Sequence, residues 1–150
     1  MSLLGSLTAL LPVDGAGTSA LVTRLRDGAT ATVSLPEPFV VDGPLETGAI
    51  SRSSGAITIR WRPADGVQRM TWIATSNCPS GTAAAVAGDT VPDRGELAIS
   101  ASRMPAAESG ACAASLSLRR EREGALGAAF PAGSTISGAQ ERTVAFTLVP

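Results

Sequence analysis

The stretch that decides the fold class is residues 56–62, which read Ala-Ile-Thr-Ile-Arg-Trp-Arg. Every second side chain from Ile57 to Trp61 is apolar, and the side chains between them are polar. Because successive side chains of a β-strand point to opposite faces, this alternation predicts a half-buried strand. We therefore expect Trp61 to lie in the core, with Arg60 and Arg62 on the outer face.

The same alternation is the dominant pattern of the rest of the chain. It recurs in residues 30–35, 70–73, 97–100, 114–119 and 143–148. Asp-Gly pairs, which favour tight turns, separate several of these stretches. We predict that Asp27-Gly28 and Asp65-Gly66 each close a hairpin between two neighbouring strands.

This spacing predicts an all-β fold with seven to nine short strands. Such strands suit a two-sheet antiparallel β-sandwich of immunoglobulin-like type. Pro36 and Pro38 should restrict residues 39–41 to a short edge strand or an extended crossing. Four bulky aromatic residues should help to fill the core, namely Trp61, Trp72, Phe130 and Phe146.

Two segments rich in small residues, 76–89 and 124–138, are expected to form long loops. Binding residues commonly lie on such loops, because the sheet scaffold holds them in place. One helical turn is expected near residues 102–109.

We expect residues 16–150 to form a single sandwich domain. Residues 1–15 would be a natural N-terminal arm or an artificial boundary of the chain. The start of the chain is apolar, but it has no basic residue before Arg24, unlike a signal peptide. No apolar run reaches the roughly 18 residues of a transmembrane helix, so none is predicted.

The residue types missing from the chain exclude several functions. Its 150 residues contain no His, and its 12 basic residues are all Arg. Without His there is no Ser-His or Cys-His catalytic pair, and without Lys there is no Schiff base. A net charge of −1 argues against nucleic acid or an anionic membrane as the main partner. We therefore expect neither enzymatic activity nor a cofactor.

The two cysteines, Cys78 and Cys112, indicate a compartment. An even number of cysteines in a small domain favours one disulfide and an oxidising environment. The alternative is two buried thiols that behave as small apolar side chains. Two thiols without His fall short of the four ligands of a zinc site.

Six residues are candidates for contact with a protein partner: Arg60, Arg62, Trp72, Arg119, Arg120 and Arg122. The run of alternating charges at residues 119–123 is typical of a solvated hairpin tip, and the alternative is a contact patch. The arginines at 60 and 62 would belong to the same patch or guard an edge strand. Trp72 is expected in the core, with surface contact as the alternative.

Carboxylates offer two further hypotheses. Asp89 and Asp93 lie four residues apart, and Asp14 and Asp42 occupy other segments, so calcium ligands exist in principle. Their spacing is not that of a calcium-binding loop, and Asp before Gly is also ordinary turn chemistry. The glutamates are scattered, and no pair is placed for glycoside hydrolysis. We expect neither activity.

Several short elements follow one another in the later part of the chain. They are Trp61 at a strand end, Cys78 in the next loop, and residues 92–99, 102–104, 116–120 and 144–146. Through these elements, residues 61–150 resemble bacterial extracytoplasmic β-sandwich domains, often found on lipoproteins and mostly without an assigned activity. The resemblance implies a sandwich outside the cytoplasm and carries over no functional residues. It does not extend to a lipid anchor, since no lipobox cysteine stands near the start.

These observations predict a non-enzymatic structural or interaction module of a bacterial envelope or surface assembly. It would lie in the periplasm, on the cell surface or in the medium, and bind a protein partner or a second copy through loops or a strand edge. One alternative is a phage or phage-tail-like virion structural protein, with an N-terminal arm that swaps between subunits. The other is a calcium- or carbohydrate-dependent adhesion domain.

Overall fold

The computed structural model describes residues 20–24, 28–42, 49–53, 55–66, 68–78, 85–104 and 110–150. In these ranges it contains eleven strands and one short 3-10 turn, η2 (Ala101–Arg103), and no α-helix. The predicted all-β class is confirmed, with more strands than the seven to nine expected. Within the same ranges, no helix has the length and apolar character needed to cross a membrane.

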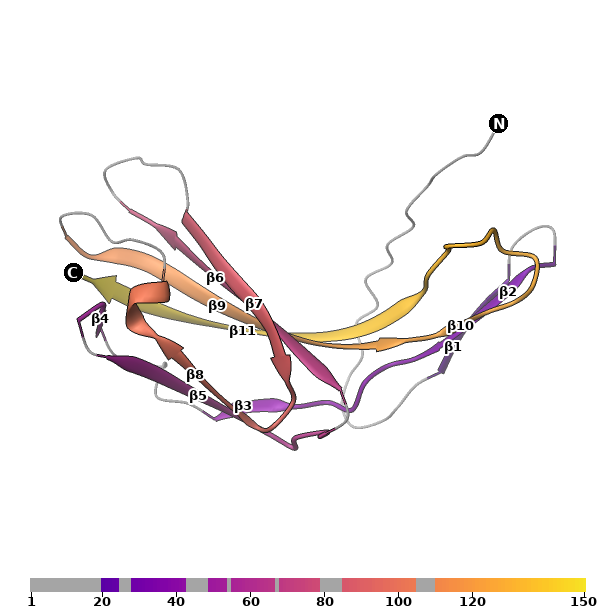
Figure 1. The fold of residues 1–150 in the computed structure, drawn as a ribbon, viewed down its shortest axis with the longest axis horizontal. Helices are drawn as coiled ribbons and strands as arrows, with labels where there is room; N and C mark the ends of the chain where they lie inside the picture. Colours follow the sequence, from indigo (N-terminus) through magenta and orange to yellow (C-terminus); the bar gives the residue numbers. More distant parts are fainter. Residues whose placement is uncertain are drawn as a thin grey trace.

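The strands form three sheets (Figure 1). Sheet A has the order β1-β2-β10, with bounds Ala20–Arg24, Thr30–Ser34 and Ala125–Leu126. Sheet B has the order β3-β5-β8, with bounds Val40–Asp42, Ala56–Arg62 and Glu96–Ser100. Sheet C has the order β4-β11-β9-β6-β7, with bounds Ala49–Ser51, Ser137–Val149, Cys112–Glu123, Arg69–Asn77 and Ala85–Pro92. Strand β4 runs parallel to β11, and the other pairs are antiparallel.

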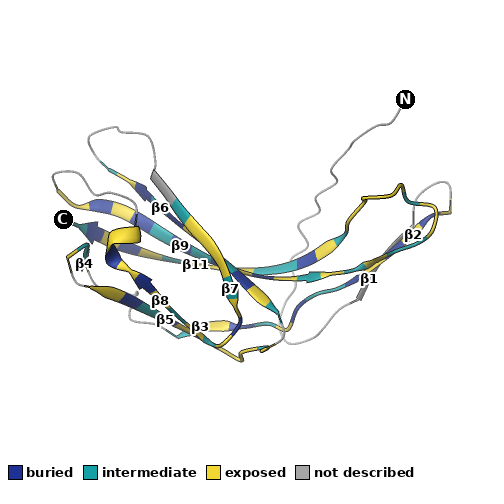
Figure 2. Ribbon diagram, viewed as in Figure 1, coloured by how far each residue is buried: buried dark blue, intermediate teal, exposed yellow. Residues whose placement is uncertain are grey.

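Sheets B and C enclose the hydrophobic core, and their buried residues lie on the sides that face each other (Figure 2). The alternation read from the sequence accounts for this arrangement. Ile57, Ile59 and Trp61 of β5 point inward, as do Leu116 and Leu118 of β9. The packing is that of a β-sandwich, whereas the strand order does not confirm the immunoglobulin-like type.

The aromatic residues of the core differ in one case from the expectation. Trp61, Trp72 and Phe146 are buried in the core as predicted. Phe130 is only half-buried and lies in a turn, where its amide donates to the carbonyl of Gly127. Phe39 is fully buried instead. It directly precedes β3, which is the predicted edge strand.

Strands β9 and β11 run out of the sandwich and carry sheet A at their far end (Figure 1). They pair continuously from Ser137↔Glu123 to Leu148↔Cys112. Strand β2 packs closely against this extension. A Cβ atom at Gly124 would overlap the carbonyl oxygen of Thr32, so the close approach requires glycine. We call the distal parts of β9 and β11, together with sheet A, the arm.

One predicted hairpin is confirmed and the other is wrong. Strands β1 and β2 pair around the Asp27-Gly28 region as expected. Strands β5 and β6, on either side of Asp65-Gly66, lie in different sheets. The amides of Asp65 and Gly66 donate to Asp93, on the turn after β7. This turn therefore passes the chain from sheet B to sheet C.

Two other expectations need correction. The charge run at residues 119–123 is not a hairpin tip, because it lies inside β9, paired with β6 and β11. Much of the expected loop 76–89 is strand, since β6 reaches Asn77 and β7 begins at Ala85. The segment 124–138 contains β10 and two turns. The predicted helical turn is represented by η2. Residues 105–109 and the expected N-terminal segment 1–15 lie outside the described residues.

Candidate functional site

The six predicted contact residues do not form one patch. Arg60 and Arg62 lie on the outer face of sheet B, and both are neutralised there. The Arg60 Nε atom lies 3.5 Å from Glu96 Oε2, and the Arg62 Nε atom lies 2.8 Å from Asp42 Oδ2. Their strand, β5, is the central strand of sheet B, so the idea that they guard a sheet edge is wrong.

Trp72 and Arg120 are buried, so their assignment as contact residues is wrong. Trp72 is 1% exposed and belongs to the core. Arg120 is 0% exposed although it stands in the most charged stretch of the chain. The signal that locates it was in the sequence: the inward phase of Leu116 and Leu118 continues to Arg120. Arg119 remains on the outer face.

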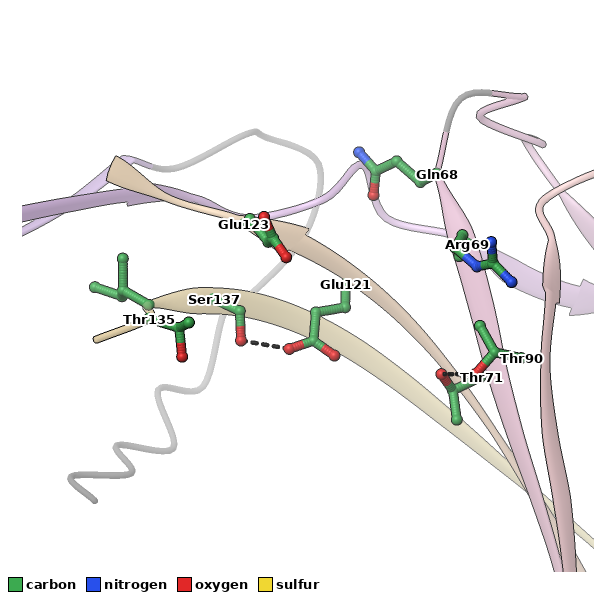
Figure 3. A pocket seen from close by; sticks show the side chains of 9 residues that line it. Gln68, Arg69, Thr71, Thr90, Glu121, Glu123, Thr135 and Ser137 are labelled. Carbon is green, nitrogen blue, oxygen red and sulfur yellow. Dashed lines mark hydrogen bonds between the residues drawn. The ribbon is translucent and has the colours of Figure 1, made fainter. Parts of the chain in front are cut away.

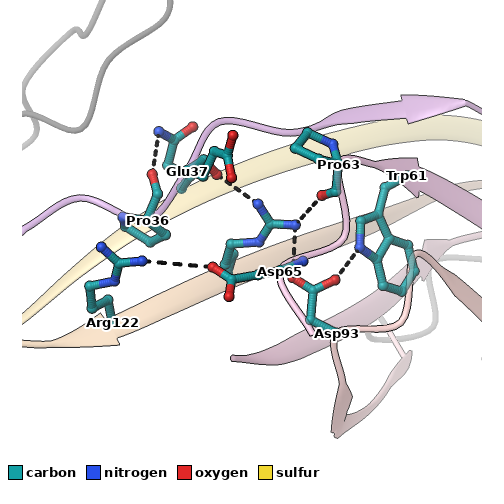
Figure 4. A network of polar contacts seen from close by, with 9 residues as sticks. Pro36, Glu37, Trp61, Pro63, Asp65, Asp93 and Arg122 are labelled. Atoms are coloured by element: carbon teal, nitrogen blue, oxygen red, sulfur yellow. Dashed lines mark hydrogen bonds and ion pairs between the residues drawn. The ribbon is translucent and has the colours of Figure 1, made fainter. Parts of the chain in front are cut away.

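Arg120 is the centre of a buried polar network at the base of the sandwich (Figure 4). Its Nη2 atom lies 2.7 Å from Asp93 Oδ2 and 2.6 Å from the carbonyl oxygen of Pro63. Its Nη1 atom donates to the carbonyl oxygen of Glu37 at 2.7 Å. Its guanidinium carbon lies 4.9 Å from the centre of the Phe39 ring, a cation–π contact.

Asp93 completes this network from the other side. Its Oδ1 accepts the Trp61 Nε1 hydrogen at 2.6 Å, and its Oδ2 accepts the amide of Asp65 at 3.2 Å. Arg122 approaches Asp65 at 3.7 Å at the rim (Figure 4). The network joins β5, β9 and the segments before β3 and after β7. A buried charge pair with such hydrogen bonds stabilises one arrangement of these segments and leaves neither carboxylate oxygen of Asp93 open.

The calcium hypothesis gains no support from the aspartates. Asp93 is engaged as described, and Asp42 pairs with Arg62. Asp89 accepts the amide of Thr90 at 2.8 Å and lies 3.2 Å from Arg103 Nη2, and these two donors hold the pKa of Asp89 below its ordinary value. In the described ranges, no three metal-ligating side chains gather around a common point. Asp14 lies outside these ranges.

Cys78 and Cys112 form the predicted disulfide. Cys78 directly follows β6 and Cys112 begins β9, and the register Asn77↔Ala113 places the two cysteines opposite each other. Their Cα atoms are 4.4 Å apart. The bond therefore ties the ends of two neighbouring central strands of sheet C.

A groove of about 430 Å³ lies on the outer face of sheet C, where the arm leaves the sandwich (Figure 3). It is lined by Gln68, Arg69, Thr71, Thr90, Glu121, Glu123, Thr135, Ile136 and Ser137. None of the six contact residues predicted from the sequence lines it. Sequence reasoning missed the groove because its residues come from four separate segments that only the pairing of β6, β7, β9 and β11 brings together.

The charges of the groove are incompletely paired. Glu121 accepts a hydrogen bond from Ser137 and lies 3.6 Å from Arg119 Nε. Among the residues that the structure describes, Arg69 has no carboxylate within 4 Å, and no arginine lies within that distance of Glu123. A cation and an anion without an ion-pair partner in the described ranges thus border the same groove.

Comparisons with protein families, curated proteins and solved structures find no match to this chain. The candidate site is therefore defined by the chain's own geometry. It is the groove with Arg69, Glu121 and Glu123, because Arg120 and Asp93, the ion pair of the other large polar cluster, are fully buried. The two large exposed hydrophobic residues, Val40 and Ile73, lie on different sheets and form no common patch in the described structure.

Proposed function

We propose that this chain is a non-enzymatic structural or interaction module of a bacterial envelope or surface assembly. It binds a protein partner through the groove on the outer face of sheet C. The observation that carries the proposal is the contrast between a buried network whose charges are paired and a groove in which Arg69 and Glu123 have no ion-pair partner among the described residues. Exposed charged groups that form no ion pair with the described part of the chain can pair with charges of another protein.

The groove chemistry supports binding rather than catalysis. The chain has no His or Lys to act as a base or nucleophile near neutral pH. The one buried carboxylate near the sandwich base, Asp93, is already bound by Arg120 and Trp61. In the groove, Glu121 and Glu123 are exposed, so no enclosed site excludes water from them.

The location outside the cytoplasm is supported by the disulfide. Disulfides persist in oxidising compartments and are rare where thioredoxin and glutathione keep thiols reduced. The bond between Cys78 and Cys112 fits that environment. A protein isolated from its native source under a thiol alkylator should carry no label on either cysteine. Complete labelling of both would place it in the cytosol and favour the virion alternative.

A site-specific photo-crosslinker in the native host tests the partner directly. It replaces Thr135 in the groove or, as the matched control, Ala98 on the outer face of sheet B; both positions are exposed. The proposal predicts a discrete crosslinked protein from the groove position only. Equal crosslinking from both positions, or none from the groove, would contradict it.

A further inference from the structure

We infer that the groove receives an extended segment of the partner protein that carries a basic side chain toward one end and an acidic side chain toward the other. This inference rests on the proposed function and names the chemistry of its partner. It follows from the order of charges along the groove, from the hydrogen-bonding groups between them, and from the side chains that are missing.

The first step is the order of charges. Arg69 and Glu121 are cross-strand neighbours on β6 and β9, and Glu123 follows two residues further along β9 on the same face. Glu121 shares its charge with Arg119, whereas Glu123 has no cation within 4 Å in the described structure. The groove is therefore negative toward the arm and positive toward β6 (Figure 3). A ligand with the reverse order of charges is favoured at both ends.

The second step is the lining between the charges. Thr71 and Thr90 form a hydroxyl pair at 3.3 Å, and Thr135 and Ser137 lie across the groove (Figure 3). These donors and acceptors match the amide and carbonyl groups of a peptide backbone.

The third step separates a peptide from a sugar. Carbohydrate sites usually combine polar side chains with an aromatic ring on which the sugar stacks, and none of the nine residues that line the groove is aromatic. A neutral sugar also supplies no counter-charge for Arg69 or Glu123. A neutral oligosaccharide is therefore kept as the competing outcome of the test.

The test is an NMR titration of the ¹⁵N-labelled protein with three probes. These are five-residue capped peptides with Lys first and Glu last around three serines, the same peptides with both charges replaced by serine, and maltotriose. We expect the charged peptide to shift the amide signals of Arg69, Glu121 and Ser137 more strongly than the other probes do. Because each exposed ion pair contributes up to about 1 kcal/mol, Glu123→Gln should weaken binding about two- to fivefold.

The matched control is Glu96→Gln, which removes an exposed carboxylate from sheet B and should leave the affinity unchanged. The inference is overturned if the charged and uncharged peptides bind alike, if neither binds at millimolar concentration, or if maltotriose binds at the groove instead. Failure of the proposed function is a separate result. A crosslink from Thr135 without charged-peptide binding leaves the protein partner standing and removes its proposed chemistry.

Discussion

Arg120 and Glu121 are neighbours on β9, and they belong to two different regions of the molecule. Arg120 points into the sandwich, is fully buried, and reaches Asp93 and two backbone carbonyls. Glu121 points outward into the groove, where it is exposed to water. One residue of a strand is enough to move a charge from the buried network to the groove.

The difference shows how burial decides the role of a charged side chain. A buried charge costs several kcal/mol unless it is paired and hydrogen-bonded, so the network holds the fold together and is closed to a ligand. An exposed charge costs little when it has no partner, so Arg69 and Glu123 can stand in the groove without an ion pair to any described residue. The network should therefore dominate stability, and the groove should dominate binding.

Removing the buried carboxylate should have the largest effect. Asp93→Ala leaves Arg120 buried without its counter-charge and removes the acceptor of Trp61 Nε1. Breaking one partner of a buried pair costs about 3–5 kcal/mol of the free energy of unfolding, measured by urea denaturation. The control Glu96→Ala breaks an exposed pair and should cost no more than about 1 kcal/mol. Equal losses would erase the contrast between buried and exposed charges.

The disulfide should come next. Its sequence separation is 34 residues, and closing such a loop stabilises the fold by about 3–4 kcal/mol in the chain-entropy model. The double variant Cys78→Ala/Cys112→Ala should lower Tm, and a reductant should lower the Tm of the wild type but not of the variant. A wild-type Tm that is indifferent to the reductant would show that the bond is absent in solution.

The two buried tryptophans allow a matched test of the network's hydrogen bond. Trp61→Phe loses the Nε1 donor to Asp93. The matched variant Trp72→Phe loses an Nε1 group that has no acceptor among the described residues. Both changes remove the same volume from the core. A hydrogen bond to a charged group contributes about 1.5–3 kcal/mol. Trp61→Phe should therefore lower the free energy of unfolding, measured by urea denaturation, more than Trp72→Phe does. The opposite order would mean that packing, rather than this bond, fixes Trp61.

The groove should tolerate substitution without loss of stability. Glu123→Lys removes a carboxylate that has no described partner, so the free energy of unfolding should change by no more than about 0.5 kcal/mol. The same variant should lose the binding of the charged peptide in the NMR titration. A large loss of stability would assign Glu123 to the fold instead of to the groove.

The smallest effect concerns Asp89, an exposed carboxylate. The amide of Thr90 and then the guanidinium of Arg103 hold its pKa below the ordinary value. Because the folded pKa is lowered, the small stabilisation is present above the unfolded pKa near 4 and is lost as pH falls through the folded pKa. NMR titration should show the pKa of Asp89 rising in Arg103→Ala but staying low in Arg60→Ala. No change in Arg103→Ala would contradict the assigned role of Arg103 and leave the amide of Thr90 and the charge of Arg69 as the causes.

Local pattern predicted much of the fold. The alternation around Trp61 located β5 and its inward face, and Asp27-Gly28 located a hairpin. The alternation of a strand depends only on nearby residues and so is visible in a sequence. The turn at Asp65-Gly66 misled because its partner is Asp93, 28 residues away, and local turn chemistry does not say which strands will pair.

The candidate site was less accessible to sequence reasoning. The alternation of β9 that places Leu116 and Leu118 inside also places Arg120 inside and Arg119 outside. That alternation is visible in the sequence. The groove had no such signal. It is assembled from β6, β7, β9 and the start of β11 with the two residues before it, and it depends on which distant strands pair.

The most direct test of the account is to compare the two neighbours on β9. Urea denaturation of Arg120→Leu and Glu121→Gln gives the free energy of unfolding of each. We predict a loss of about 3–5 kcal/mol for Arg120→Leu, because Asp93 stays buried without its cation, and no more than about 1 kcal/mol for Glu121→Gln. If Arg120→Leu does not fold, Arg120→Gln, which keeps hydrogen-bond donors, should fold with reduced stability. Equal losses in the two positions, or a neutral Arg120→Leu, would contradict the division between a structural network and a binding groove.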